Sequence, residues 1–340
     1  MRVRALVRRI VRQFKHDKRS LALMFLAPLL ILTLMSLVFN GSAYEPKVAV
    51  VDVPEPLAES LASRGAVVTE RTLADAEASL AAGELDAIVR FADGAPAVTL
   101  EGSDPAVSRA VLLLLQDAAQ RLAPATAAKP AVDYLHGSEE MSAFDNFGPV
   151  LVAFFSFFFV FMLAGIAFLR ERTGGTLERL LATPLKRGEI VAGYLLGFGV
   201  FAALQSILIA WFSIRVLDLM MVGSFALALV VTLSLALTAL TLGTFLSAYA
   251  SNEFQMIQFI PLVVVPQVFF SGLFNLETMV DWLRWLSYIM PLSYAADAMR
   301  DVMIRGEGWS DIAEDVYALL GFSLLFAAAN VFALKKHRRI

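Results

Sequence analysis

The sequence contains no cysteine and only three histidines, and these shortages exclude several kinds of site. Without cysteine there is no disulfide framework, no thiol nucleophile and no cysteine metal site. The histidines form no plausible Ser-His-Asp arrangement, because His16 and His337 lie in strongly basic stretches. His136 precedes three carboxylates that lack the spacing of metal ligands, so a solvated surface is the favoured interpretation and no metal site is expected. These carboxylates are Glu139, Glu140 and Asp145.

A phosphate-binding loop is also missing. No segment has the pattern G-x-x-x-x-G-K-[ST], and the glycines at 174, 175, 197 and 199 lack the lysine and the strand that such a loop requires. We therefore expect no ATPase site, no catalytic residue and no cofactor on this chain. The formal net charge of -3 provides no overall attraction to nucleic acid, so no nucleic-acid partner is expected.

Apolar residues, by contrast, are abundant. They make up 58% of the 340 residues, with a mean hydropathy of +0.69. A helix needs about 20 consecutive apolar residues to cross a bilayer. Six segments are that long, and they predict a polytopic α-helical membrane protein with six transmembrane helices. The predicted spans are residues 21–39, 147–169, 190–214, 219–247, 254–276 and 316–334.

Two of these predicted spans have an alternative or an irregular feature. The sequence Gly41-Ser42-Ala43 after the first span resembles a signal-peptide cleavage site. An uncleaved anchor is favoured, because the apolar stretch is longer than a usual signal core and the basic leader has about 20 residues. Pro261 and Pro266 interrupt the fifth span, and prolines are tolerated in a span where neighbours satisfy the freed carbonyls.

The predicted spans contain no aspartate and no lysine. Arg215, Asp218 and Glu253 lie only at their edges. A charge at the centre of the bilayer costs about 2.5–3.5 kcal/mol and is kept mainly for function. An ion-coupled carrier is therefore poorly supported, and if the protein transports, the energy comes from another polypeptide.

Lysine and arginine are concentrated on one side of the predicted spans. Residues 1–19 carry eight of them, the loop after the second span carries five and the C-terminal tail four. With six spans these regions share one side, which holds 17 of the 28 basic residues. Residues 277–315, on the opposite side, are rich in acid. The positive-inside rule therefore predicts that both termini are cytoplasmic.

Residues 1–20 predict an amphipathic cytoplasmic helix. Its apolar residues recur at helical spacing while basic residues fill the other face, so we expect it to lie in the membrane interface beside anionic headgroups. The alternative is that the leader is only an orientation signal. The apolar positions are Val3, Leu6, Val7, Ile10, Val11 and Phe14.

Residues 41–146, between the first two spans, alternate strand and helix signals. This order predicts an inserted α/β domain with a mixed sheet, which we expect to be extracytoplasmic and non-catalytic. Residues 123–130, rich in Ala, Thr and Pro, predict a linker. The expected strands are residues 47–53, 66–70, 85–91 and 95–100, and the expected helices are residues 56–63, 73–82 and 105–122. Residues 147–340 hold the other five spans.

The loop from residue 168 to residue 195 contains five basic residues and a short helix. Gly174-Gly175 interrupts the preceding helix, and residues 176–182 restart it for about two turns before Thr183-Pro184 ends it. Leu177, Leu180 and Leu181 give this helix one apolar face. Because so short a helix is unstable alone in water, we expect it to dock on a soluble partner.

The motif R-E-R-T-G-G-T-L-E-R-L-L-A-T-P at residues 170–184 closely resembles the cytoplasmic loop of type-2 ATP-binding-cassette (ABC) exporter permeases. The later runs at residues 270–274, 282–285, 291–294 and 298–300 resemble the last extracellular connection of that family. Residues 83–91 are similar to the ectodomain that some members insert between their first two spans. The resemblance covers nearly the whole chain and implies the permease subgroup with an extracellular domain, in the plasma membrane of a bacterium or archaeon.

The resemblance also implies partners and contact residues. Residues 3–19 correspond to the connecting helix and residues 176–182 to the coupling helix, which contact two copies of a separate P-loop ATPase that binds ATP and Mg²⁺. A second permease subunit completes a homodimer or heterodimer surrounded by lipid. Residues 277–305 correspond to re-entrant helices in the outer leaflet. The implied coupling residues are Arg172, Thr176, Leu177, Glu178, Arg179, Leu180, Leu181 and Pro184, and the re-entrant residues are Trp282, Trp285, Pro291 and Tyr294.

In that family the translocation path is lined largely by the second and fifth spans, which here are rich in phenylalanine. An aromatic slot suits a hydrophobic or amphipathic substrate such as a drug or lipid. The alternative is that these rings face lipid. Export of a polar polymer, or a membrane-anchored receptor that uses the ectodomain, are the competing functions. The candidate path residues are Phe154, Phe158, Phe161, Gln258, Phe269 and Phe270.

Overall fold

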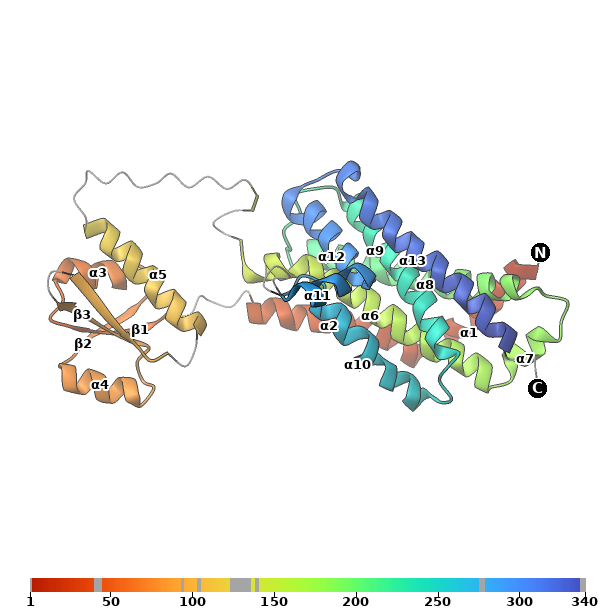
Figure 1. Cartoon of the computed structure of the whole chain (residues 1–340), viewed down its shortest axis with the longest axis horizontal. Helices are drawn as coiled ribbons and strands as arrows, with labels where there is room; N and C mark the ends of the chain where they lie inside the picture. Colours follow the sequence, from red (N-terminus) through yellow and green to blue (C-terminus); the bar gives the residue numbers. More distant parts are fainter. Residues whose placement is uncertain are drawn as a thin grey trace. The chain divides into compact units, whose positions relative to one another are not determined.

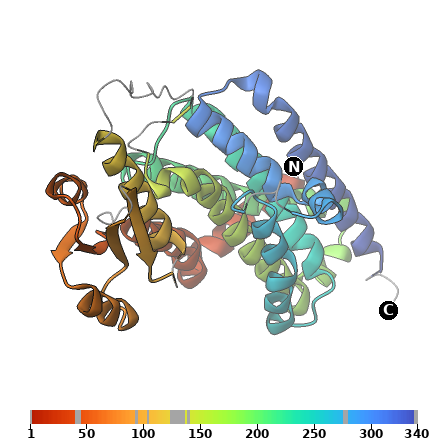
Figure 2. The ribbon, with the colours of Figure 1, turned by 60° about the vertical axis from the view of Figure 1, so that its left-hand side comes forward.

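A computed structural model of the chain describes residues 2–39, 45–92, 95–102, 105–122, 136–137, 141–274 and 279–336. The chain divides into two compact units, each with its own internal packing (Figures 1 and 2). The helical unit comprises Met1–Asn40 and Tyr134–Ile340, and the α/β unit comprises Gly41–Asp133. The predicted linker at residues 123–130 lies outside the described residues.

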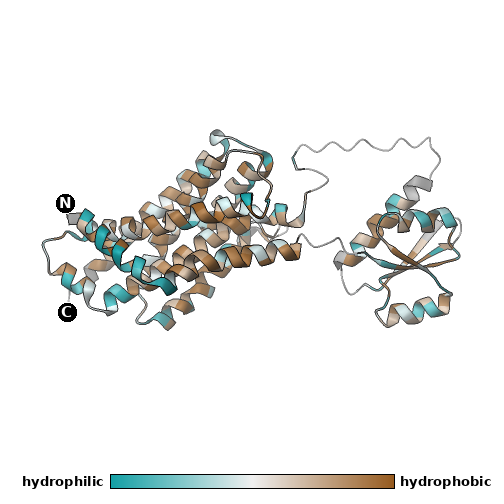
Figure 3. Cartoon of the chain, turned by 180° about the vertical axis from the view of Figure 1, so that it is seen from behind, coloured by the Kyte–Doolittle hydropathy of each residue, from teal (hydrophilic) through white to brown (hydrophobic). Residues whose placement is uncertain are grey.

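The helical unit is built from long apolar helices, which Figure 3 colours mainly as hydrophobic. Among the described residues, five helices are long and apolar enough to cross a membrane. They are α2 (Lys18–Phe39), α6 (Ala143–Thr173), α8 (Arg187–Arg215), α9 (Phe225–Ser247) and α13 (Trp309–Lys336). A sixth apolar helix, α10 (Glu253–Phe269), has 17 residues. The chain is therefore a mostly helical, polytopic membrane protein.

Two predicted spans extend beyond the observed helices. The fourth was expected to start at residue 219, but α9 starts at Phe225, because the preceding segment pairs with another part of the chain. The Val222 N–H donates to Met303 O at 2.9 Å and the Gly223 N–H donates to Val302 O at 3.1 Å. The fifth was expected to reach residue 276, but α10 ends at Phe269, three residues before Gly272 adopts a left-handed conformation (φ +76°).

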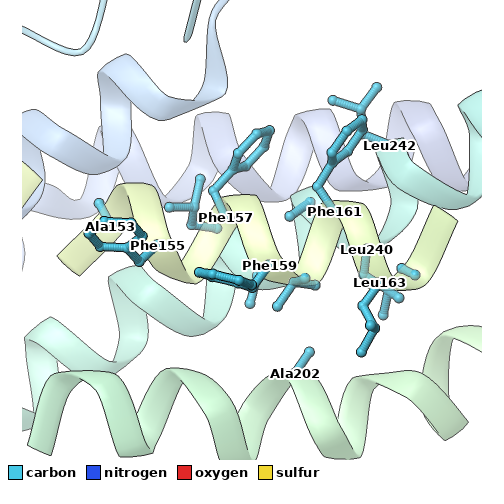
Figure 4. Packing of buried hydrophobic residues seen from close by; sticks show 14 of the residues in the cluster. Ala153, Phe155, Phe157, Phe159, Phe161, Leu163, Ala202, Leu240 and Leu242 are labelled. Atoms are coloured by element: carbon cyan, nitrogen blue, oxygen red, sulfur yellow. The ribbon is translucent and has the colours of Figure 1, made fainter. Parts of the chain in front are cut away.

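Helix α6 lies at the centre of the helical unit and packs against α2, α8, α9 and α12 (Pro291–Arg300). Phe157 and Phe161 are fully buried and stack with their ring centroids 5.8 Å apart (Figure 4). The contact with α9 is close: a Cβ atom on Gly243 would lie 2.4 Å from Phe161 O. Glycine therefore permits the approach of these two helix backbones.

Polar contacts also join α9 to α13. The Thr238 hydroxyl donates to Leu319 O at 2.9 Å, and Asn330 Nδ2 donates to Thr241 O at the same distance. Both contacts are buried. Such interhelical hydrogen bonds are worth about 0.6 kcal/mol each in membrane proteins, so they fix the register of the helices more than they stabilise the fold.

The short elements of the helical unit lie before and between the long helices. Helix α1 (Arg2–His16) precedes α2, and α7 (Thr176–Leu181) lies between α6 and α8. After α10 come α11 (Asp281–Arg284), a 3-10 helix at Trp285–Ile289, α12 and a π-helical turn at Asp301–Arg305.

The α/β unit contains a four-stranded sheet in the order β2-β1-β3-β4. Strand β1 (Lys47–Val51) is parallel to β2 (Val67–Glu70) and to β3 (Ala87–Ala92), and β4 (Ala95–Leu100) is antiparallel to β3. In the register of the sheet, Val48 of β1 lies opposite Val68 of β2 and opposite Ala87 of β3. Helices α3 (Glu55–Ala62), α4 (Leu73–Ala81) and α5 (Pro105–Leu122) follow or connect the strands.

Helices cover both faces of this sheet. Successive side chains of a strand point to opposite faces, so each face contributes buried residues to a core. Val48, Val50 and Val89 share one core with residues of α3 and α5. Ala49 and Ile88 share a second core with residues of α4. The unit is therefore a three-layer α/β structure built on a core of its own.

Candidate functional site at the end of α6

The sequence Gly174-Gly175 separates α6 from α7, as predicted. The Gly174 N–H donates to Arg170 O at 2.9 Å and closes the last turn of α6. Gly175 then adopts the left-handed conformation (φ +70°) that turns the chain into α7, a conformation that suits glycine. Helix α7 ends at Leu181, one residue earlier than predicted, because Ala182 forms its C-terminal cap.

Glu171, in the last turn of α6, is a buried carboxylate at the junction of three helices. It accepts hydrogen bonds from Gln13 Nε2 at 2.7 Å and from the Tyr194 hydroxyl at 2.8 Å, and it forms an ion pair with Arg9. Burial lowers the pKa of Arg9, but the hydrogen bond and charge of Glu171 outweigh burial, so the net shift is upward. This carboxylate therefore ties α1 and α8 to α6.

The sequence does contain a signal for Glu171, although the candidate residues above do not include it. An acidic side chain in the last turn of a helix is unfavourable beside the negative end of the helix dipole. A carboxylate kept there between two arginines, at the end of a long apolar segment, indicates a specific set of donors. The donors on α1 and α8 could not be identified from sequence, because they depend on how the helices pack.

Arg170 and Arg172, on either side of Glu171, bind the turn between α9 and α10. The Arg172 guanidinium donates to Ala248 O at 2.5 Å and also to Ala250 O. Arg170 Nε donates to a carboxylate oxygen of Glu253 at 2.7 Å. Arg172 was expected to contact a partner protein, and in this structure its donors bind carbonyls of the same chain. Its contact with a partner stays a prediction.

Arg170 also approaches the start of α2. Its guanidinium lies 3.4 Å from Asp17 Oδ2. Asp17 accepts hydrogen bonds from the Ser20 hydroxyl at 2.6 Å and from the Ser20 N–H at 3.2 Å. These bonds, chiefly the one from the hydroxyl, and the charge of Arg170 hold the pKa of Asp17 below its usual value. The residues at the end of α6 thus also contact the junction between α1 and α2.

The amphipathic helix α1 uses its apolar face for packing against protein. Leu6 and Ile10 fit against Gly193 and Gly197 of α8, where added Cβ atoms would lie 2.4 Å and 2.8 Å from their side chains. Phe14 packs on the Phe201 ring with a centroid distance of 4.6 Å. Helix α1 therefore runs alongside α8 in the same direction. Helix α8 covers Leu6, Ile10 and Phe14 of the apolar face, whereas Val3, Val7 and Val11 are only half-buried. That α1 lies in the membrane interface stays a prediction.

Helix α7 presents a mixed surface. Leu177 is buried (2% exposed) and anchors the helix, whereas Glu178 and Arg179 are exposed. Leu180 and Leu181 are half-buried, as is Thr176. An open groove of about 380 Å³ lies between α1 and the end of α7. Its lining residues are Ala5, Leu6, Arg9, Leu180, Thr183, Pro184 and Leu185.

The candidate path residues differ in exposure. Phe154 and Phe158 are half-buried and stack with a centroid distance of 5.7 Å. Gln258 and Phe269 are exposed on α10, and Phe269 stacks on Phe274 at 5.1 Å. Phe161 and Phe270 are buried within the chain. Whether any of these side chains lines a path stays a prediction.

The expected re-entrant segment, residues 277–305, is described except for residues 277 and 278. Trp282 and Trp285 are highly exposed, at 73% and 62%. Pro291 is buried at the first position of α12, and the Tyr294 hydroxyl donates to Tyr288 O at 2.8 Å.

Two hydrogen bonds fasten α12 to the end of α10. The Leu292 N–H donates to Gln267 Oε1 at 2.9 Å, and Arg300 donates to Gly272 O at 2.5 Å. The end of α10 and α12 are therefore directly connected.

The described residues contain no group of three or more His, Asp or Glu side chains able to hold a metal ion. Of the carboxylates near His136 in the sequence, Glu139 and Glu140 lie outside the described residues. The Asp145 carboxylate accepts hydrogen bonds from Ser142 at the start of α6 and from the Met220 N–H at 2.8 Å. Asp145 therefore has a structural role in the helical unit.

Comparisons with known proteins identify related sequences. A family model described as "ABC-2 family transporter protein" matches residues 18–332. ABC transporter G family member 20 of Dictyostelium discoideum is 29% identical over 181 residues, 53% of this chain and 25% of that protein. The probable multidrug ABC transporter permease YbhR of Escherichia coli (strain K12) is 24% identical over 173 residues, 51% of this chain and 47% of YbhR.

A further relative is the linearmycin resistance permease protein LnrN of Bacillus subtilis (strain 168). It is 27% identical over 192 residues, which cover 53% of this chain and 48% of LnrN. The chain thus spans about half the length of these bacterial relatives and a quarter of the Dictyostelium protein.

Proposed function

Because the chain belongs to the ABC-2 family of transporter proteins, and is a multi-pass membrane permease without an ATPase site of its own, we propose that it exports a hydrophobic or amphipathic substrate using ATP hydrolysed by a partner. The partner we propose is a P-loop ATPase that binds ATP and Mg²⁺, in two copies. The observation that carries this proposal is α7, a helix braced by the buried Leu177 that exposes Glu178 and Arg179 beside an apolar groove.

The proposed docking surface combines α7 with α1. The groove between them offers Leu180, Leu185 and Pro184, while Arg9 at its edge is held by Glu171. An ATPase side chain that enters this groove would bury apolar surface next to a fixed positive charge. The exposed residues of α7 would form the polar rim that such interfaces usually have.

The proposed topology has six spans, with α10 as the shortest. Seventeen helical residues extend about 26 Å, a little less than the usual hydrocarbon thickness of about 30 Å. Both termini and α7 then lie in the cytoplasm, where the positive-inside rule places the basic regions. The α/β unit lies on the opposite side of a bacterial or archaeal plasma membrane.

We further propose that two permease subunits pair and that the path lies between them. Helix α10 supports this arrangement, because it exposes Leu262, Val265 and Phe269 at 70%, 47% and 49%. Phe154 and Phe158 of α6 are partly open as well. Pairing through these helices would place aromatic and apolar side chains along the path, whether the second subunit is identical or not. Two relatives are named as a multidrug permease and a linearmycin resistance permease, and these names support a drug as the substrate that we propose.

The test replaces Leu180 and Leu181 with aspartate in the full chain and measures co-purification of the ATPase, ATPase activity and transport. Burying unpaired carboxylates costs several kcal/mol, so we expect the ATPase to be lost and transport with it. The matched control replaces Leu112 and Leu113, two exposed leucines of α5, with aspartate and should behave as the parent. If the L180D/L181D variant kept its ATPase and full transport, α7 would not be the docking helix.

A further inference from the structure

We propose that Arg172 is a positioning residue that makes the turn between α9 and α10, residues 248–252, move together with α7. This inference rests on the proposed function, because it concerns how a movement at the docking helix reaches α10. In this role Arg172 connects two segments of its own chain, whereas the resemblance of the sequence motif implies a direct contact with the partner.

The contacts of Arg172 bring α6 and the turn together. Its guanidinium donates to two carbonyls, Ala248 O and Ala250 O. Ala248 is the C-terminal cap of α9, where carbonyls lack partners within the helix and carry the negative end of its dipole. A planar guanidinium that binds two carbonyls fixes their positions relative to α6 better than a single ammonium could.

A second contact holds the other end of the same turn. Arg170 donates to both carboxylate oxygens of Glu253, at 2.7 Å and 3.3 Å. Glu253 is the first residue of α10. This pair is half exposed and on its own contributes little to stability, so the partly buried Arg172 is the stronger tie.

The link from α7 to Arg172 is short and continuous. The Gly175 N–H donates to Arg172 O at 3.2 Å, and the Arg179 N–H donates to Gly175 O at 3.3 Å. Gly175 is the N-terminal cap of α7. A displacement of α7 is therefore transmitted through the last turn of α6 to the Arg172 side chain, and from there to the start of α10, the helix that carries Gln258 and Phe269.

The experiment measures hydrogen–deuterium exchange in the complex of the full chain with its ATPase, with ATP analogue and with ADP. In the parent we expect nucleotide to change exchange both at residues 176–181 and at residues 248–252. In Arg172→Met, which keeps an apolar side chain of similar length but no donors, the change at 176–181 should remain and the change at 248–252 should be lost. Transport per ATP hydrolysed should fall in parallel.

Two further variants control for simple misfolding. Arg172→Lys keeps the charge with fewer donors and should retain part of the response. Arg215→Met removes an exposed arginine from the last turn of α8 and should match the parent. If the turn still responded to nucleotide in Arg172→Met, or if Arg172→Met and Arg172→Lys lost the responses of both segments, the inference would be wrong. If the parent showed no response at α7, the proposed function would fail first, and this inference with it.

Discussion

At the scale of single residues, the end of α6 shows how one buried carboxylate organises its surroundings. Glu171 accepts from Tyr194, whose side chain is 1% exposed, and pairs with Arg9, which is partly exposed. Removing the Glu171 carboxylate should therefore lower the free energy of unfolding mainly through Tyr194, because a buried hydroxyl without an acceptor costs about 1–3 kcal/mol.

We accordingly predict that Glu171→Leu lowers the thermal unfolding temperature of the detergent-solubilised protein and loosens α1. Glu171→Gln keeps an acceptor for Tyr194 and should lose less. The matched control is Glu77→Gln, on the exposed surface of α4, which should leave the unfolding temperature unchanged. Equal unfolding temperatures for Glu171→Leu and the control would show that this hydrogen-bond set does not stabilise the fold.

Sequence alone indicates which residues of this region are unusual, but not what they bind. The two arginines and the acid between them stand out from the apolar segment before them. Their partners lie far away along the chain, at residues 9, 13, 194, 248 and 253. Those pairings depend on helix packing, which no local pattern encodes.

At the scale of helices and strands, apolar length was the reliable signal. It placed the long helices, and the Gly-Gly break placed the start of α7. Apolar length failed at the start of α9, where residues 222 and 223 form hydrogen bonds with residues 303 and 302 in place of helical ones. It also failed at the end of α10, which Gly272 follows in a left-handed conformation. Apolar spacing also did not show that α8 covers Leu6, Ile10 and Phe14 of α1. An amphipathic helix looks the same in sequence whether lipid or another helix covers it.

The signal that was available for α1 is the pair Gly193 and Gly197, four residues apart on α8. Small residues at this spacing let helices approach closely. We predict that the double variant Gly193→Ala/Gly197→Ala exposes α1 to trypsin and lowers the unfolding temperature, because overpacking a tight contact costs about 1–3 kcal/mol. The measurements are the rate of cleavage within residues 2–19 and the thermal unfolding curve.

Gly199→Ala is the control for this prediction. Its added Cβ would lie at an ordinary contact distance of 3.8 Å from Leu240, and alanine favours a helix over glycine. We expect trypsin resistance equal to the parent and an equal or slightly higher unfolding temperature. Should the double variant resist trypsin as well as Gly199→Ala does, α1 is not held by its contact with the two glycines.

At the scale of the whole molecule, the topology to be tested is the side of the membrane on which the α/β unit and α7 each lie. The positive-inside rule assigns the basic ends to the cytoplasm and, with an uncleaved first span, the α/β unit to the opposite side. The chain has no cysteine, so single cysteines can be introduced without background. In intact cells we expect Glu77→Cys, exposed on α4, to react with an impermeant thiol reagent.

The second position for this test is Arg179, exposed on α7. Arg179→Cys should react only after the cells are opened. Labelling of Arg179→Cys in intact cells, with protection of Glu77→Cys, would reverse the topology and place α7 where no ATPase could reach it.

The polar groups inside the long helices bear on the kind of substrate that the whole molecule can carry. The buried polar side chains of the long helices are mostly serine and threonine hydroxyls, many of which bond to their own helix. A sugar or ion would need a continuous array of hydrogen-bonding groups to replace its hydration. A lipid tail or an apolar drug needs an apolar slot and a polar edge, which α6 and α10 can provide.

We therefore predict that lipids and amphipathic drugs stimulate the ATPase activity of the reconstituted complex and that short glycans do not. A variant with Phe158→Ala and Phe269→Ala should respond less to the amphiphiles while keeping its unstimulated ATPase activity, because both side chains are partly exposed. A wide pore between two subunits could stay hydrated and carry a polar polymer without internal ligands. Stimulation by glycans alone would favour that pore and rule out the apolar slot.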